Sequence, residues 1–362
     1  MLRSYKYRIY PNKEQQKSID ETLETCRYLY NHFVYERKIM YEFDKTNISY
    51  SWQQNSLPFR KKINPYMQLV HSQVLQDVAH RVDKAYKNFF RRVKSGENPG
   101  YPRFKGKGRY NSFTYPQRGY DIANGRLKLS CIGNVKIELH RPIEGEVKTC
   151  AIIRKNGKYY ASFVCNVAVS PLPETGKAVG IDMGIENFCI TSEGVFYPSP
   201  KSYRKAEKKL RQAQRKAARR KKGSNRRKKA VAELAKAHEK IANQRKDISH
   251  KVALDLVSKY DFIAYEDLTI KNMVKNHHMA KSISDAGWGI FFRILEYKAE
   301  SAGKMSIGVN PYKSSQECSE CGAEVLKKLS QRWHDCPNCG NSEHRDKNAA
   351  KVILKRGLQE TA

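Results

Sequence analysis

The sequence has no long hydrophobic run. Hydrophobic residues make up 40% of its 362 residues, and its mean hydropathy is -0.75. A membrane-spanning helix needs about 20 mostly apolar residues in succession, so we expect no such segment. The first residues, Met1 to Lys6, also lack the apolar core of a secretory signal. These absences predict a cytoplasmic protein.

Acidic residues are scarce. The chain has 36 Asp and Glu against 69 Lys and Arg, which gives a net charge of +33. A chain this basic repels itself unless it binds a polyanion, and nucleic acid is the expected partner. An acidic membrane surface is the competing partner, but nothing in the sequence favours it. We therefore expect a nucleic-acid-binding protein that is nucleoid-associated in a prokaryote.

Paired cysteines are few. Five of the nine cysteines are scattered, an odd number typical of a reducing compartment: Cys26, Cys131, Cys150, Cys165 and Cys189. The other four form two CxxC pairs, Cys318/Cys321 and Cys336/Cys339. Four thiolates complete the tetrahedral shell of one zinc ion and leave no open position. The spacing predicts a structural zinc ribbon, and the alternative is two unrelated pairs of reduced cysteines.

The N-terminal half changes character along its length. Residues 6–10 alternate like a strand, and Asn12 with Gln15 then resembles a helix N-cap. Helical periodicity runs through residues 19–34 and again through 66–93, on either side of a polar stretch at 44–55. Short alternating segments follow from about residue 127, and Asn156-Gly157 predicts a hairpin turn between two of them. We expect the first strand to join these later strands, with the helices inserted.

Two basic segments suit nucleic acid. Residues 201–230 carry sixteen Lys and Arg against Glu207 alone, a net of +15, and Gly223-Ser224-Asn225 interrupts them, which predicts a helical hairpin. No acidic partner is expected to compensate at i+4, so we predict contact with a phosphate backbone, through Arg215, Arg219, Arg220, Lys221 and Lys222. Basic and aromatic residues alternate in 103–115, which suits base stacking or a solvated hairpin whose aromatics pack inward.

Three carboxylates stand beside apolar segments. Asp182 lies in the apolar run 178–185, and Glu266 closes the run 262–266. A charge in a buried strand is costly unless it has a partner. Asp346 precedes an Ala-rich helix expected to begin near Lys347, where an Asp alone is usually a helix cap. Between them, we expect a loop of small residues at 282–289, a helix at 290–300 and a strand at 305–309.

Five motifs resemble those of the TnpB (OrfB) family of transposon-encoded, RNA-guided nucleases related to type V CRISPR effectors. The similarity covers nearly the whole chain. The motifs are Gly180-Ile181-Asp182-Met183-Gly184, Tyr265-Glu266-Asp267-Leu268, the segment 282–289, the segment 314–322 and Arg345-Asp346-Lys347-Asn348-Ala349-Ala350.

The resemblance implies a multidomain α/β and β-barrel protein. A split RNase H-like (RuvC) nuclease domain would carry the zinc ribbon, and a strand-rich wedge barrel would carry an inserted helical recognition module. The implied parts are a first wedge strand at 1–11, the recognition module at 12–95, the wedge barrel at 96–170, the nuclease at 171–309 with its basic hairpin at 201–260, the ribbon at 310–342 and the last nuclease segment at 343–362.

The resemblance also implies an activity, which is cleavage of double-stranded DNA next to a short flanking motif, guided by RNA from the transposon end. Asp182, Glu266 and Asp346 would form the catalytic triad and hold two Mg²⁺ ions about 4 Å apart. The family pattern assigns recognition of the flanking motif to Tyr50, Ser72, Gln76 and Thr114. Two alternatives remain open: a binding protein that does not cut but represses transcription or assists transposition, and a guide-free RuvC-type nuclease.

Overall fold

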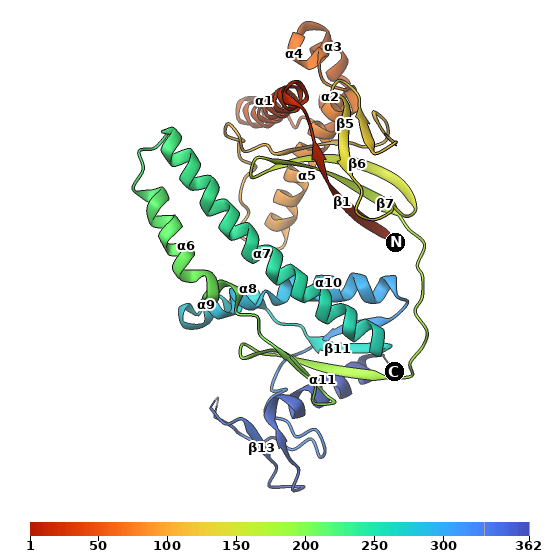
Figure 1. The fold of residues 1–362 in the computed structure, drawn as a ribbon, viewed down its shortest axis with the longest axis vertical. Coiled ribbons are helices and arrows are strands. Elements are labelled where there is room, and N and C mark those ends of the chain that lie inside the picture. The colour runs from red at the N-terminus through yellow and green to blue at the C-terminus, as the bar shows by residue number, and fades with distance from the viewer. Residues whose placement is uncertain (329, 362) are drawn as a thin grey trace. The chain divides into compact units, whose positions relative to one another are not determined.

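The structure is a computed structural model that describes residues 1–328 and 330–361. The chain, drawn in Figure 1, divides into two compact units, Met1–Ala168 and Val169–Ala362. Of the helices it describes, none is both long enough and apolar enough to cross a membrane.

The first unit contains a seven-stranded antiparallel sheet in the order β2-β6-β7-β1-β5-β4-β3. The N-terminal strand lies inside this sheet, paired with β7 on one side and β5 on the other. Its strands are β1 (Leu2–Tyr10), β2 (Ser112–Tyr115), β3 (Tyr120–Ala123), β4 (Arg126–Leu129), β5 (Gly133–Glu138), β6 (Glu146–Lys155) and β7 (Lys158–Asn166). In the described part of the chain no pairing joins the edge strands β2 and β3, so the closed barrel expected from the sequence is not seen.

The turn between β6 and β7 is the predicted hairpin. Lys155 pairs with Lys158 across it, and Asn156 and Gly157 have φ angles of 52° and 71°. Positive φ at both central residues is what a type I′ turn requires, and Asn-Gly adopts it at little strain. The sequence prediction is confirmed here because the signal is local.

Five helices are inserted between β1 and β2. They are α1 (Lys13–Asp44), α2 (Tyr50–Asn55), α3 (Leu57–Ile63), α4 (Pro65–Gln68) and α5 (Ser72–Lys94). The Asn12 side chain accepts from Gln15 N and the Gln15 side chain accepts from Asn12 N, a capping box that confirms the expected helix start.

The helical pattern was less accurate further on. The polar stretch contains α2, because the Ser49 hydroxyl accepts from Trp52 N and starts a helix there. The segment 66–93 is divided between α4 and α5, since Asn64 caps a separate short helix through Tyr66 N. Phe33 of α1, Leu75 of α5 and Phe163 of β7 are fully buried in one core.

The second unit is built on a mixed five-stranded sheet in the order β10-β9-β8-β11-β12. The central strand β8 pairs antiparallel with β9 and parallel with β11, which pairs parallel with β12. The strands are β8 (Ala178–Met183), β9 (Asn187–Thr191), β10 (Phe196–Pro198), β11 (Phe262–Glu266) and β12 (Met305–Val309), and β13 (Trp333–Asp335) and β14 (Ser342–His344) form a separate ladder.

The helices of this unit are α6 (Ser202–Ala218), α7 (Asn225–Lys259), α8 (Ile270–Met273), α9 (His277–Ala286), α10 (Trp288–Ser301) and α11 (Arg345–Thr361). Helices α6 and α7 form the expected hairpin (Figure 1). The loop expected at 282–289 is wrong, because α9 continues to Ala286. Gly287, with a φ of 72°, ends that helix, and α10 begins at the next residue.

Two glycines allow α11 to lie directly on the sheet. A Cβ atom at Gly180 of β8 would lie 2.0 Å from the carbonyl oxygen of Ala350 in α11, and one at Gly357 of α11 would lie 2.6 Å from Ala264 Cβ in β11. Neither position has room for a side chain. The close approach brings the N-terminal turn of α11, which contains Asp346, toward the strands that carry Asp182 and Glu266.

Candidate functional site

Asp182 lies in the central strand β8, among buried neighbours. Register pairs Ile181 with Tyr265 of β11, so the next residue along each strand, Asp182 and Glu266, occupies the same edge of the sheet. The pKa of Asp182 is raised well above its usual range by burial and then by the negative charges of Glu266 and Asp346, while Arg345 lowers it. The three predicted carboxylates are therefore electrostatic neighbours.

Glu266 ends β11 and is 7% exposed. Burial raises its pKa, a hydrogen bond from Ser314 and the charge of Arg356 lower it, and Asp346 raises it again. The Ser314 hydroxyl donates to Glu266 Oε1 at 2.5 Å. Glu266 is thus a buried carboxylate held by one neutral donor.

Asp346 lies in the first turn of α11. Its backbone N–H donates to His344 Nδ1 at 3.2 Å, and its charge raises the pKa of both other carboxylates. Asp346 is the second residue of α11, inside the helix. Carboxylates are hard oxygen donors of the kind that Mg²⁺ prefers. A cation beside Asp182 and Glu266 would offset the negative charges that raise their pKa, so these residue types suit Mg²⁺.

The four cysteines gather around one point. Their sulfur atoms all lie within 4.8 Å of one another, and the Sγ–Sγ distances are 3.6 Å for Cys318–Cys339 and for Cys321–Cys336. Four sulfurs at about 2.3 Å from a tetrahedral zinc would be separated by about 3.8 Å. Among the described residues, these cysteines are the one group of three or more His, Cys, Asp or Glu side chains whose ligand atoms lie close enough together to hold a metal ion. Their arrangement is consistent with zinc binding.

The basic hairpin presents its charge to solvent. Arg215, Arg219, Arg220, Lys221 and Lys222 are all exposed, and none of them pairs with a carboxylate in the part of the chain that is described. The expectation that no acidic residue compensates this segment is wrong. Glu207 accepts from Arg211 at i+4, at 3.0 Å, and Glu233 on the facing helix accepts from Lys216 at 2.7 Å. The first pair lies within α6, and the second joins α6 to α7, where residues 17 positions apart in the sequence meet.

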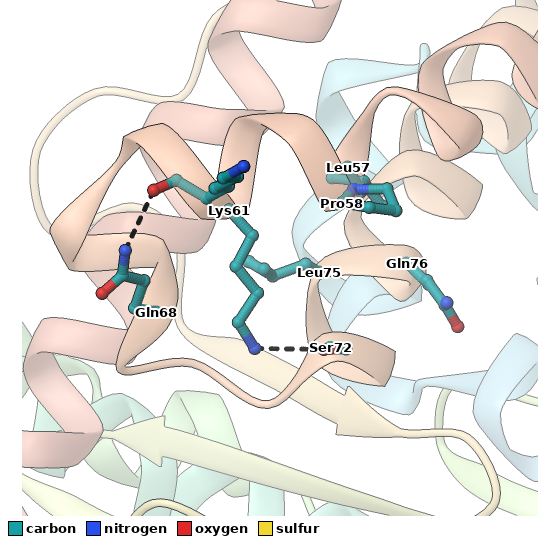
Figure 2. Close-up of a pocket in the computed structure, with 8 residues that line it drawn as sticks. Leu57, Pro58, Lys61, Gln68, Ser72, Leu75 and Gln76 are labelled. Carbon is teal, nitrogen blue, oxygen red and sulfur yellow. Dashed lines mark hydrogen bonds between the residues drawn. The ribbon is translucent and has the colours of Figure 1, made fainter.

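The four residues assigned to the flanking motif belong to the first unit, and they are only partly gathered. Ser72 and Gln76 lie one turn apart on α5 and line the same pocket (Figure 2). The Ser72 hydroxyl accepts from Lys61 Nζ at 3.0 Å. The ring of Tyr50 packs against His80, one further turn along α5, with 6.1 Å between ring centroids.

Thr114 does not lie on α5 with Ser72 and Gln76. It is on β2, and its hydroxyl oxygen accepts from Arg81 at 2.7 Å. Arg81 also donates to the backbone oxygen of Ser112 and to Asp77. Thr114 therefore takes part in a contact that ties α5 to the sheet.

The sequence did not single out several residues near the carboxylates. Ser314, Arg345 and Arg356 each act on Asp182 or Glu266 through a hydrogen bond or a charge. Ser314 and Arg345 lie inside two of the family motifs, and that was the available signal. Arg356 lies outside the motifs, and no spacing rule connects it with Glu266.

Three family descriptions match parts of this chain. Residues 162–277 match OrfB_IS605, described as "Probable transposase". Residues 288–353 match the Cas12f1-like TNB domain, and residues 1–45 match a helix-turn-helix domain of the same OrfB group. In the structure, residues 1–45 comprise the strand β1 and the single helix α1.

Full-length relatives agree with these matches. A protein of Streptomyces pristinaespiralis named "Putative RNA-guided DNA endonuclease" is 32% identical, with 99% of this chain and 90% of that protein aligned. A protein of Escherichia coli K12 with the same description, InsQ, is 30% identical over 98% of this chain and 92% of its own length. The chain belongs to the TnpB (OrfB/IS605) family.

A solved structure of a Cas12f1–sgRNA–target DNA complex aligns with 98% of this chain and 99% of the matched chain in that complex, at 15% identity and a TM-score of 0.37. A score this low adds nothing to the fold assignment.

Proposed function

We propose that this protein is an RNA-guided DNA endonuclease of an IS605-type transposon, which cuts target DNA beside a short flanking motif. The observation that carries the proposal is that Asp182 and Glu266 follow paired residues of two parallel strands, with Asp346 near enough for its charge to act on both, in a chain with a net charge of +33. The names of its full-length relatives support the same activity.

In this proposal, the second unit is an RNase H-like (RuvC) nuclease. The mixed sheet with β8 at its centre supports that fold, because two parallel strands and a helix each supply one carboxylate. The nuclease would comprise residues 171–309 and 343–362, with the ribbon at 310–342. The seven-stranded sheet of the first unit would be the wedge domain, and the inserted helices at 12–95 would be the recognition module.

Asp182, Glu266 and Asp346 would hold two Mg²⁺ ions. When bound, such ions activate a water and stabilise the leaving oxygen of a phosphodiester. The chain itself would position the carboxylates: the register of β8 with β11 supports a common place for two of them, and the packing of α11 on Gly180 would bring the third toward them. Ser314 restricts Glu266 by its hydrogen bond.

The exposed cations of the α6–α7 hairpin would contact the phosphate backbone of guide RNA or target DNA. Sequence would be recognised mainly by base pairing with the guide. Ser72 and Gln76, which share a pocket on α5, would recognise the flanking motif, since hydroxyl and amide groups can pair with base edges.

The test uses the purified protein with its co-purified RNA and a plasmid that carries a matching target, in Mg²⁺. Asp182→Ala should abolish cutting and leave RNA binding intact. Asp267→Ala, which removes an exposed carboxylate beside Glu266, is the matched control. If Asp182→Ala still cuts, the site is wrong. Cutting that persists after all RNA is removed would favour a guide-free nuclease, and biological function without any of the three carboxylates would favour a binding protein.

A further inference from the structure

A serine of the ribbon segment contacts the candidate active site. Ser314 Oγ donates to Glu266 Oε1 at 2.5 Å, and the two residues are 3% and 7% exposed. A carboxylate has two oxygens. This bond occupies one of them and restricts rotation of the whole group, which orients the second oxygen. Partners of this kind orient the side chains that bind metals, and their removal weakens metal binding.

The backbone that carries Ser314 is held by helix α11. Arg356 donates from Nη1 to the carbonyl oxygens of Asn310 and Tyr312, at 2.8 Å each, and from Nη2 to the carboxylate of Glu317 at 2.5 Å. These acceptors lie on both sides of Ser314 in the chain. Arg356 therefore fixes the short segment from which the serine reaches Glu266.

The same helix holds the first cysteine pair. Asn348, which is 0% exposed, accepts from the backbone N–H of Ser319 at 2.8 Å and donates to the carbonyl oxygen of Glu317 at 2.7 Å. Cys318 lies between those two residues. Asn348 follows Asp346 by two positions on α11, so one helix carries a carboxylate, fixes the first cysteine turn and fixes the serine that holds Glu266.

We propose that Ser314 is a positioning residue for Glu266, and that the clamp of Asn348 and Arg356 on residues 310–319 makes the four-cysteine ribbon a support for the carboxylate site. This inference rests on the proposed function, because it takes Glu266 as a ligand of divalent cations. Ser314 does not itself contact the substrate; it acts through the orientation of one carboxylate.

The first experiment measures Mn²⁺ affinity by electron paramagnetic resonance on the full chain with its RNA. Ser314→Ala should weaken Mn²⁺ binding by roughly 10- to 100-fold, while Ser314→Thr, which keeps the hydroxyl, should bind nearly as the wild type does. The matched control is Ser249→Ala, because Ser249 is 2% exposed and donates only to a backbone carbonyl in α7. Zinc content should be equal in all three variants.

The inference is overturned if Ser314→Ala binds Mn²⁺ within about twofold of the Ser249→Ala control, or if Ser314→Thr is as weak as Ser314→Ala. Asp182→Ala separates this outcome from failure of the proposed function. Unchanged Mn²⁺ binding in Asp182→Ala would remove the carboxylate site altogether. Binding lost in Asp182→Ala but kept in Ser314→Ala would remove the positioning role alone.

A double-mutant cycle tests the clamp. Asn348→Ala should weaken Mn²⁺ binding in the wild-type background and add little in the Ser314→Ala background, because both changes release the same carboxylate. If the loss of Mn²⁺ affinity in the double variant equals the product of the two single losses within about twofold, Asn348 does not act through Ser314. If Asn348→Ala does not fold, Asn348→Ser takes its place in the same cycle.

Discussion

Gly180→Ala should displace α11 and with it Asp346. The added Cβ would lie 2.0 Å from Ala350 O and 2.7 Å from Leu354 N, and both are backbone atoms that cannot rotate away. Because an unstrained contact needs roughly 3.5 Å, the helix must recede by about 1.5 Å or the strand must distort. Overpacking of this kind typically costs about 1–3 kcal/mol of stability.

The same displacement should slow cutting. A shift of about 1 Å in a catalytic group can lower the rate by about 10²-fold, so Gly180→Ala should cut on the order of 10²-fold more slowly. Gly357→Ala makes its contact at the other end of α11, away from Asp346, and should lower the melting temperature with a smaller effect on the rate.

The assays are thermal melting followed by tryptophan fluorescence and single-turnover plasmid cleavage. Gly100→Ala is the control, because its Cβ would meet nothing within 4 Å and its backbone does not require glycine. If Gly180→Ala melts and cuts as the wild type does, the close packing of α11 on β8 does not position Asp346, and the reasoning fails.

Three further predictions concern the ions and the basic surface. Cys336→Ser should lose bound zinc and folded yield together, because a structural zinc contributes on the order of 10 kcal/mol to folding; equal melting curves with and without chelator would contradict this. Folding raises the pKa of Asp182 and Glu266, so the ion-free protein should lose stability as pH rises above the usual carboxylate range. Mg²⁺ should therefore raise the melting temperature more at about pH 8 than at about pH 6. An equal rise at both pH values would refute this prediction. Replacement by Gln of Arg219, Arg220, Lys221 and Lys222 should weaken DNA binding. It should also make the slope of log binding constant against log salt concentration shallower, by up to about 0.9 per lost phosphate contact. An unchanged slope would exclude the hairpin from the DNA interface.

The sequence alone determined the features that depend on neighbours in the chain. The two CxxC pairs predicted the gathered thiols, since two such turns bring four sulfurs to one ion. Asn156-Gly157 predicted its hairpin and Asn12 with Gln15 predicted its cap, because turn and cap chemistry are local. The same local rules failed at 282–289, where small residues suggested a loop and tertiary packing favoured two helices around Gly287.

Only the tertiary structure decided how distant segments meet. The spacing of Asp182, Glu266 and Asp346 carries no information about distance, and their proximity follows from the register of β8 with β11 and from the fit of α11 against Gly180. Ser314, Asn348 and Arg356 acquire their contacts with the carboxylate and cysteine sites in the same way. Hydrogen bonds and charge interactions act over a few ångströms in space, whatever the separation along the chain, so these contacts exist only once the fold has formed.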